Sequence, residues 1–283
     1  MNPAIIAANH AKDFREEIGL KEKDVVGDIV QLITKTAGYE YEENNFSEPF
    51  YGCSEYKGSG IFKISYNLKF NWNEAFKRFT LAHEIGHISI HQEYLREHIL
   101  HRCFSHDQFI KPMEIEADYF AANFLAPSNE CLRLISNKEF TPEAIRFLST
   151  YFNISTYAAG LRFIDLTDLI CTLIIFNDNG KTEFERRSPR MEEMLKPFFI
   201  PYVRKSVIHE NTLAYEFVSG KRESETCTSE LNFWQPKLPK KVETTESIID
   251  LGFNGKFMAL LTPTIPNLDE YLAQEDRSPT IYS

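Results

Sequence analysis

The chain has 283 residues, 43% of them hydrophobic, with 23 Phe and 13 Tyr, so intrinsic disorder is excluded and two domains are expected. Its formal charge of -10 at pH 7 argues against a nucleic-acid-binding surface, because an acidic protein repels phosphate backbones. The five cysteines form no CxxC pair, and no segment has the apolar length of a signal peptide or a membrane span, so we expect a cytoplasmic protein outside the membrane.

The first part of the chain is expected to be mainly helical. Apolar residues at helical spacing predict helices over 3–20 and 24–38, each ending near a glycine. The segment 51–67 is rich in glycine and alternates between 61 and 66, which predicts a small hairpin or an edge of a sheet. A long helix without proline is expected over 72–95.

The later part of the chain changes from helices to strands. A boundary between two domains is expected near residue 167. The elements expected on either side are a polar connection at 101–112, a helix at 113–127, two helices within 139–166 that are joined by a turn at 152–155, hairpins at 169–187 and 247–263, a helix near 190–196 and an alternating stretch at 226–233.

The segment FTLAHEIGHISIH, residues 79–91, carries the residues with metal chemistry. Residues four apart on a helix lie about 6 Å apart along its axis and point in similar directions, so His83 and His87 can bind one zinc ion. Glu84 can take a proton from a water on that ion, which is the chemistry of the HExxH motif. His91 lies about 12 Å from His83 along an unbroken helix and is rejected as a ligand.

A catalytic zinc site needs a third protein ligand and one open position. Glu114 begins the helix expected after the motif, and Asp118 lies one turn further on the same face. One carboxylate can therefore bind the metal while the other holds a ligand imidazole through its second nitrogen. Glu116 on a different face is the alternative ligand, and Cys103 in the polar connection is a further one.

The substrate side of the site is less defined by the sequence. Hydrolysis of a peptide needs a group that stabilises the oxyanion, and Arg78, His91 and Tyr119 all lie near the motif by helical geometry. The sequence assigns this role to none of them, and Arg78 and His91 fit equally well as partners of buried carboxylates. An edge strand at 61–66 is expected beside the motif helix, where it could pair with an extended peptide.

Two segments together carry a family resemblance. RFTLAHEIGHISIH, followed by EIEADYFAANFLAP, resembles the helices of the ImmA/IrrE family of bacterial and phage metallopeptidases, and the resemblance extends over residues 5–166. It implies that His83, His87 and Glu114 bind zinc and that Glu84 is the catalytic base. It also implies a protein substrate, a helix-turn-helix transcriptional repressor encoded on a mobile element or in a stress regulon.

Motif and resemblance together predict the α+β fold class. Residues 1–166 are expected to form a mainly helical, zincin-like peptidase domain with a small sheet and a helix-turn-helix-like cap at 139–166. Residues 167–283 are expected to form a smaller α+β domain with a sensor or regulatory role. The sequence does not indicate the oligomeric state.

Other functions are weighed against the peptidase. A metal-containing sensor or interaction protein without proteolysis would need the fourth zinc position filled by protein, from Cys103 or His106. A DNA-binding regulator would use residues 139–166, but these hold only two basic side chains, so direct DNA binding is not expected. His209 with Arg204 and Lys205 is a candidate anion pocket in the second domain.

Overall fold

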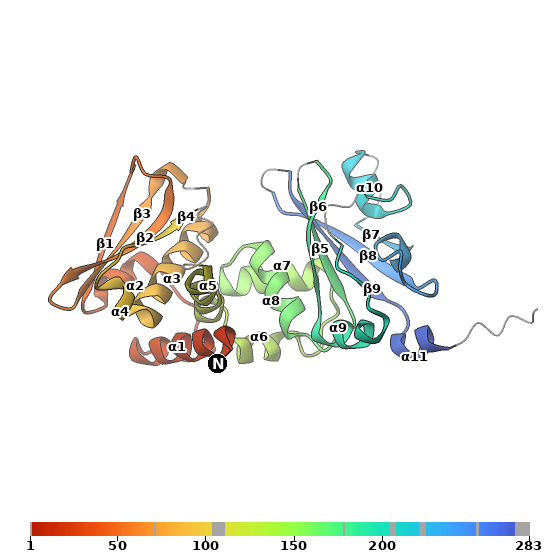
Figure 1. Cartoon of the computed structure of the whole chain (residues 1–283), viewed down its shortest axis with the longest axis horizontal. Helices are drawn as coiled ribbons and strands as arrows, with labels where there is room; N and C mark the ends of the chain where they lie inside the picture. The colour runs from red at the N-terminus through yellow and green to blue at the C-terminus, as the bar shows by residue number, and fades with distance from the viewer. Residues whose placement is uncertain are drawn as a thin grey trace, which may run out of the picture. The chain divides into compact units, whose positions relative to one another are not determined.

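A computed structural model of the chain describes residues 2–70, 72–103, 111–177, 179–203, 208–220, 225–252 and 255–274. Its contacts define two compact units, Met1–Leu134 with Phe147–Arg162, and Ile135–Arg146 with Phe163–Ser283 (Figure 1). The predicted α+β class is confirmed, because a helical region with a small sheet is followed by a five-stranded antiparallel sheet. The boundary near residue 167 stays a prediction.

Helices and strands follow one another as Figure 1 labels them. The helices are Pro3–Glu17 (α1), Ile29–Lys35 (α2), Glu74–Ile90 (α3), Gln92–Leu95 (α4), Lys111–Leu125 (α5), Ser128–Ile135 (α6), Pro142–Phe152 (α7), Thr156–Leu166 (α8), Pro189–Leu195 (α9), Leu213–Val218 (α10) and Leu268–Ala273 (α11). The strands are Tyr39–Asn44 (β1), Phe50–Gly58 (β2), Ile61–Asn67 (β3), Leu100–Cys103 (β4), Thr172–Phe176 (β5), Thr182–Arg187 (β6), Thr226–Glu230 (β7), Glu243–Asp250 (β8) and Phe257–Pro263 (β9). Short 3₁₀ turns lie at Leu68–Phe70, Lys196–Phe198 and Leu231–Phe233.

Polar caps decide where the first helices begin. The Asn2 side chain accepts a hydrogen bond from the backbone N–H of Ala4, at 3.0 Å, where α1 begins. Asp28 caps α2 in the same way, so the helix expected from residue 24 begins five residues later and is shorter than predicted. Asn73 caps the motif helix α3 by accepting from the N–H of Phe76, at 2.8 Å.

The small sheet of the first unit has the strand order β1-β3-β2-β4. The predicted hairpin is confirmed, since β2 and β3 pair antiparallel. The predicted edge position of residues 61–66 is wrong, because β1 pairs with the free side of β3 in parallel and leaves β1 and β4 at the edges. Helix α3 packs between this sheet and α5, and α1 packs against α5 as well.

Helices α7 and α8 form the predicted pair. The Ser155 hydroxyl accepts a hydrogen bond from the N–H of Ala158, at 3.1 Å, and so caps the second helix. Of the helices in the described ranges, none is both long and apolar enough to cross a membrane.

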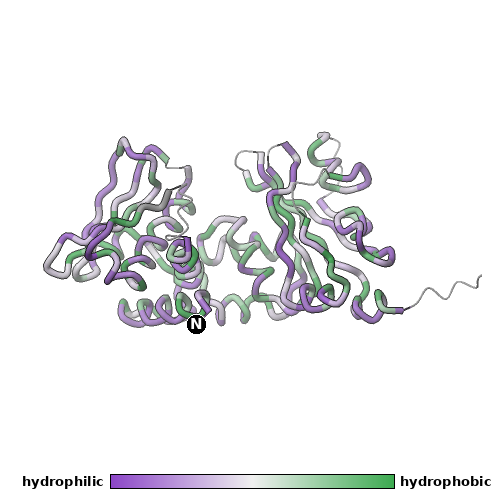
Figure 2. The backbone as a smooth tube through the Cα atoms, in the orientation of Figure 1, coloured by the Kyte–Doolittle hydropathy of each residue, from purple (hydrophilic) through white to green (hydrophobic). Residues whose placement is uncertain are grey.

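The sheet of the second unit is antiparallel, in the order β6-β5-β9-β8-β7. The expected hairpin at 169–187 is confirmed, with Gly180 in the turn at a φ of +66°. The pairing of β8 with β9 confirms the second hairpin, although Asn254 of its turn lies outside the described residues. Figure 2 shows that β5 and β9 are the hydrophobic strands of this sheet, and one face of them packs into a core that includes residues of α9, α10 and α11.

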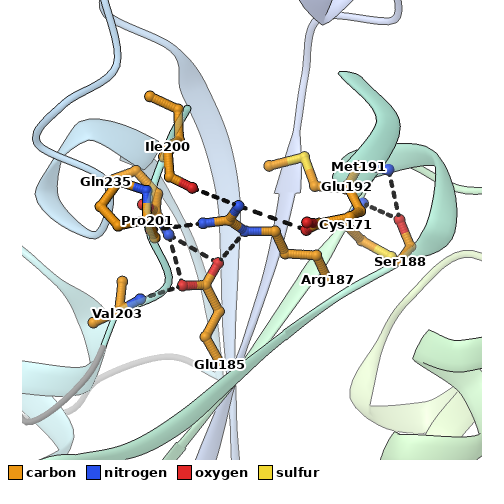
Figure 3. Close-up of polar contacts among 10 residues, drawn as sticks. All are labelled: Cys171, Glu185, Arg187, Ser188, Met191, Glu192, Ile200, Pro201, Val203 and Gln235. Atoms are coloured by element: carbon orange, nitrogen blue, oxygen red, sulfur yellow. Dashed lines mark hydrogen bonds and ion pairs between the residues drawn. The ribbon is translucent and has the colours of Figure 1, made fainter. Parts of the chain in front are cut away.

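A buried ion pair organises one side of the second unit (Figure 3). The Nε atom of Arg187 donates to Glu185, at 2.6 Å, and both side chains are at most 2% exposed. The rest of the guanidinium donates to the carbonyls of Ile200 and Pro201, at 3.0 and 2.8 Å. The Glu185 carboxylate also accepts from the Gln235 side chain, at 2.8 Å. The pair therefore fastens the segment after α9 to strand β6.

Candidate metal centre

Helix α3 presents the motif residues to the interior of the first unit. His83, Glu84 and His87 are each at most 1% exposed. Gly86 on the same helix allows α5 to approach closely, because a Cβ atom at this position would lie 3.0 Å from the Cβ of Phe120. The close crossing brings the first turn of α5, and Glu114 with it, to the histidines.

Three donor atoms from the two helices meet at one point. The Nε2 atom of His83 lies 3.2 Å from one carboxylate oxygen of Glu114, and the Nε2 atom of His87 lies 3.2 Å from the other. The ligand atoms of this group all lie within 4.8 Å of one another. The structure therefore brings together the three residues that were predicted to bind the metal.

The donor atoms fit a metal ion better than they fit one another. Despite the short distances, His83 Nε2, His87 Nε2 and Glu114 Oε1 are buried and make no hydrogen bond of acceptable geometry to any described residue. Buried polar atoms without a partner are costly, and a cation between them would satisfy all three. Two imidazoles and one carboxylate are a donor set of catalytic zinc sites, which leave one coordination position open.

Ionisation of Glu114 is consistent with this role. Burial alone would raise the pKa of the Glu114 carboxyl, but the imidazoles of His83 and His87 outweigh burial and hold this pKa below its ordinary value. Glu114 therefore carries the negative charge that a metal ligand needs at neutral pH.

The outer nitrogens of the two histidines have different partners. The Nδ1 atom of His83 lies 2.8 Å from a carboxylate oxygen of Asp118, the contact expected from the sequence. The Nδ1 atom of His87 lies 3.1 Å from the Nδ1 atom of His91, whose Nε2 atom lies 2.9 Å from Glu116. Glu116, the alternative ligand predicted from the sequence, thus contacts His91 and does not join the group of donor atoms.

The long helix predicted over 72–95 breaks at His91. This residue has φ of -115° and ψ of 29°, so α3 ends at Ile90 and α4 begins after it. The break does not turn His91 toward the metal position, because both its ring nitrogens are engaged, by His87 and Glu116. Burial and the neighbouring His87 lower the pKa of His91, while Glu116 opposes this shift.

The Glu84 carboxylate lies on the sheet side of α3. The Ser54 hydroxyl, from β2, donates to a carboxylate oxygen of Glu84, at 2.6 Å, and Ser54 is itself fully buried. A Cβ atom on Gly52 of the same strand would lie 2.6 Å from the other carboxylate oxygen. Strand β2 thus fixes the carboxylate of the predicted catalytic base with a hydrogen bond from Ser54, and Gly52 leaves the space that this carboxylate occupies.

The other candidate residues lie away from the metal position or outside the described residues. All three donor groups of the Arg78 guanidinium bind backbone carbonyls, of Val26, Gly27 and Asn153, so it serves the packing of the first unit. The side chain of Cys103, together with His106, Arg204 and Lys205, lies outside the described residues. His209 stacks on Phe233, with ring centroids 4.4 Å apart.

Two contributions to the site were missed from the sequence. Ser54 and Gly52 are 30 and 32 positions before Glu84, and nothing local in β2 indicates which helix covers it. The contact of His91 with His87 was missed although it had a local signal, because residues four apart are neighbours on a helix. Glu116 had none, since its spacing places it on another face of α5 than Glu114.

Two histidines four residues apart, a carboxylate from a second helix and a buried glutamate beside them define a metal site of the HExxH class. Residues 71–163 match the model of the peptidase M78 family, described as the IrrE N-terminal-like domain. The resemblance to ImmA/IrrE metallopeptidases is therefore confirmed over these residues.

Comparison with whole proteins adds information on the fold alone. No curated protein sequence matches the chain. A solved structure of a Mycobacterium tuberculosis transcriptional regulator is similar, with a TM-score of 0.53 and 12% sequence identity, over 92% of this chain and 88% of that chain. At this identity the similarity indicates a shared arrangement of elements.

Proposed function

We propose that the protein is a zinc-dependent endopeptidase in which His83, His87 and Glu114 hold the metal and Glu84 is the catalytic base. The observation that carries the proposal is that three buried donor atoms from α3 and α5 meet next to the buried carboxylate of Glu84. The peptidase M78 domain over the same residues supports it.

The residues around the metal position divide the chemistry between them. When bound, zinc lowers the pKa of a water ligand to about 7 and polarises the carbonyl of the substrate. Glu84 accepts the proton that the attacking water gives up and passes it to the leaving amine. Ser54 holds the carboxylate of Glu84 in place, and Asp118 orients the imidazole of His83 through its Nδ1 atom.

The substrate we propose is a protein, a helix-turn-helix transcriptional repressor encoded near this gene on a mobile element or in a stress regulon. The support is the resemblance to ImmA/IrrE metallopeptidases. A cytoplasmic setting goes with this substrate, and Cys53, Cys131, Cys171 and Cys227 are free thiols, as expected in a reducing compartment. The α+β second unit would supply a sensor or regulatory role.

Cleavage of the repressor tests the proposal. The full-length protein, loaded with zinc, is incubated with the helix-turn-helix repressor encoded beside its gene, and products are identified by mass spectrometry. We expect Glu84→Gln to lower the rate at least about 100-fold while zinc stays bound, because general base catalysis contributes about 10² to 10⁴. Glu74→Gln is the matched control, since Glu74 is an exposed acid in the first turn of the same helix.

Unchanged cleavage by Glu84→Gln would contradict the assignment of the base. Cleavage that survives removal of zinc by a chelator would contradict the metallopeptidase itself.

Direct DNA binding is the weaker alternative. Of the two basic residues in 139–166, Arg162 is 8% exposed and donates to the carbonyl of Ala126, at 2.7 Å. Arg146 is paired with Glu143 and Glu225, at 3.7 and 3.4 Å. A helix that reads DNA needs free basic side chains, so these contacts favour a packing role for α7 and α8.

A further inference from the structure

A chain of three side chains runs outward from the second histidine of the motif. The Nδ1 atoms of His87 and His91 are 3.1 Å apart, and the Nε2 atom of His91 is 2.9 Å from an oxygen of Glu116. The His91 side chain is 8% exposed and that of Glu116 is 18% exposed, so water has little access to either contact. The proposed reaction assigns no role to these two residues.

The direction of each hydrogen bond follows from the chemistry of the groups. An ionised carboxylate can only accept, so the proton at the Glu116 contact belongs to Nε2 of His91. A neutral imidazole carries one proton, which leaves Nδ1 of His91 as an acceptor. The contact between the two Nδ1 atoms then requires the proton on Nδ1 of His87. The Nε2 atom of His87 is left with a lone pair that points to the metal position, beside Glu114.

We propose that His91 and Glu116 are positioning residues that set the tautomer and ring orientation of His87 for metal binding. The inference rests on the metal site of the proposed function and deepens it, because it says what prepares one of the ligands. Glu116 acts through His91 and touches neither metal nor substrate.

The two ligand histidines are supported differently. His83 is held directly by Asp118, whose side chain is 53% exposed, so water can replace that carboxylate at the Nδ1 atom. No such replacement is available at His87, where the partner is a buried ring. His91→Phe or Glu116→Leu should therefore weaken metal binding more than Asp118→Asn does.

The first test is zinc affinity, measured by competition with a chromophoric chelator on the full-length metal-free protein. We expect the dissociation constant to rise about 10- to 100-fold in Glu116→Leu and His91→Phe, the range found when an outer partner of a ligand histidine is lost. Glu116→Gln keeps an acceptor for His91, so its loss should be smaller than that of Glu116→Leu. Glu93→Leu and Glu93→Gln are matched controls, because Glu93 is an exposed acid two residues after His91.

The second test reads the tautomer directly. In the metal-free wild type labelled with ¹⁵N-histidine, long-range proton–nitrogen spectra should show the proton of His87 on Nδ1, and His91→Phe should produce a mixture of tautomers. A His87 proton on Nε2 in the wild type, or wild-type zinc affinity in both Glu116→Leu and His91→Phe, would overturn the proposal. The spectrum of the wild type decides the matter even where a variant does not fold.

These measurements need no substrate, so the two proposals can fail separately. If zinc affinity depends on His91 and Glu116 but the protein cleaves no repressor, the positioning role is supported and the peptidase is rejected. If the His91 and Glu116 variants bind zinc like the wild type and the protein cleaves a repressor, the peptidase is supported and the positioning role is rejected.

Discussion

Glu84 shows how strand β2 shapes the site at the scale of single residues. Its carboxylate accepts from Ser54 and lies against Gly52, where a side chain would collide with it. The motif identified Glu84 from its spacing, but the two residues that hold it come from a strand that is distant in sequence. The motif therefore predicts the reacting group, Glu84, whereas the residues that hold it become apparent only in the folded structure.

Gly52→Ala tests this support. The added Cβ atom would lie 2.6 Å from Oε1 of Glu84 and 2.7 Å from Cγ2 of Thr80, so the carboxylate must move. Since a displacement of about 1 Å can cost about 10² in rate, we expect peptide cleavage to fall about 100-fold with zinc affinity retained. Gly27→Ala is the control, because no atom lies within 4 Å of a Cβ atom at Gly27. Equal rates for the two variants would contradict a positioning role for β2.

At the scale of elements, the close approach of α3 and α5 brings the metal ligands together. Each helix carries only part of the donor set, so the metal site exists only where the two helices are close. Gly86 sets this approach, with Phe120 of α5 packed directly over it. A larger residue at position 86 should therefore affect stability and the metal site together.

Gly86→Ala has two opposing effects on the free energy of unfolding. Alanine in a helix is favoured over glycine by about 1 kcal/mol, whereas overpacking at the contact with Phe120 costs about 1 to 3 kcal/mol. We expect a net loss of about 1 kcal/mol in urea unfolding of the metal-free protein, with weaker zinc binding. A gain in stability with unchanged zinc affinity would show that the crossing tolerates a methyl group.

Elements with a strong local signal were predictable from the sequence, and their spatial relations were not. Helical spacing of apolar residues indicated α1, the absence of proline indicated α3, the turn at 152–155 indicated the α7–α8 pair, and turn residues indicated both hairpins of the second sheet. The parallel pairing of β1 with β3 was missed, because no turn residue marks a partner that is not adjacent in the chain. The end of α3 at Ile90 was missed because neither Gly nor Pro marks it.

The second unit contributes its own stability to the whole molecule. The Glu185–Arg187 pair is buried and fully engaged with the segment 200–203 and with Gln235 (Figure 3). A buried pair adds little compared with apolar residues of similar size, but the loss of one partner is severe because a charge stays behind.

Arg187→Met should destabilise the second unit by about 3 kcal/mol, since it leaves Glu185 buried without its cation. The double variant with Glu185→Leu should recover part of this loss. Unfolding can be followed by fluorescence of Trp234 in a Trp72→Phe background, because these are the two tryptophans of the chain. Arg146→Met is the control in the same unit and should change little, because Arg146 and its partners Glu143 and Glu225 are all exposed. A double variant less stable than Arg187→Met would contradict this account of the pair.

The position of a bound zinc ion is the sharpest test of the proposed metal site. Crystals of the full-length protein grown with zinc would be measured at the zinc absorption edge. We expect an anomalous peak about 2.0 to 2.2 Å from Nε2 of His83, Nε2 of His87 and a carboxylate oxygen of Glu114. A peak at other residues, or a Glu114 carboxylate turned away from the two imidazoles, would contradict it.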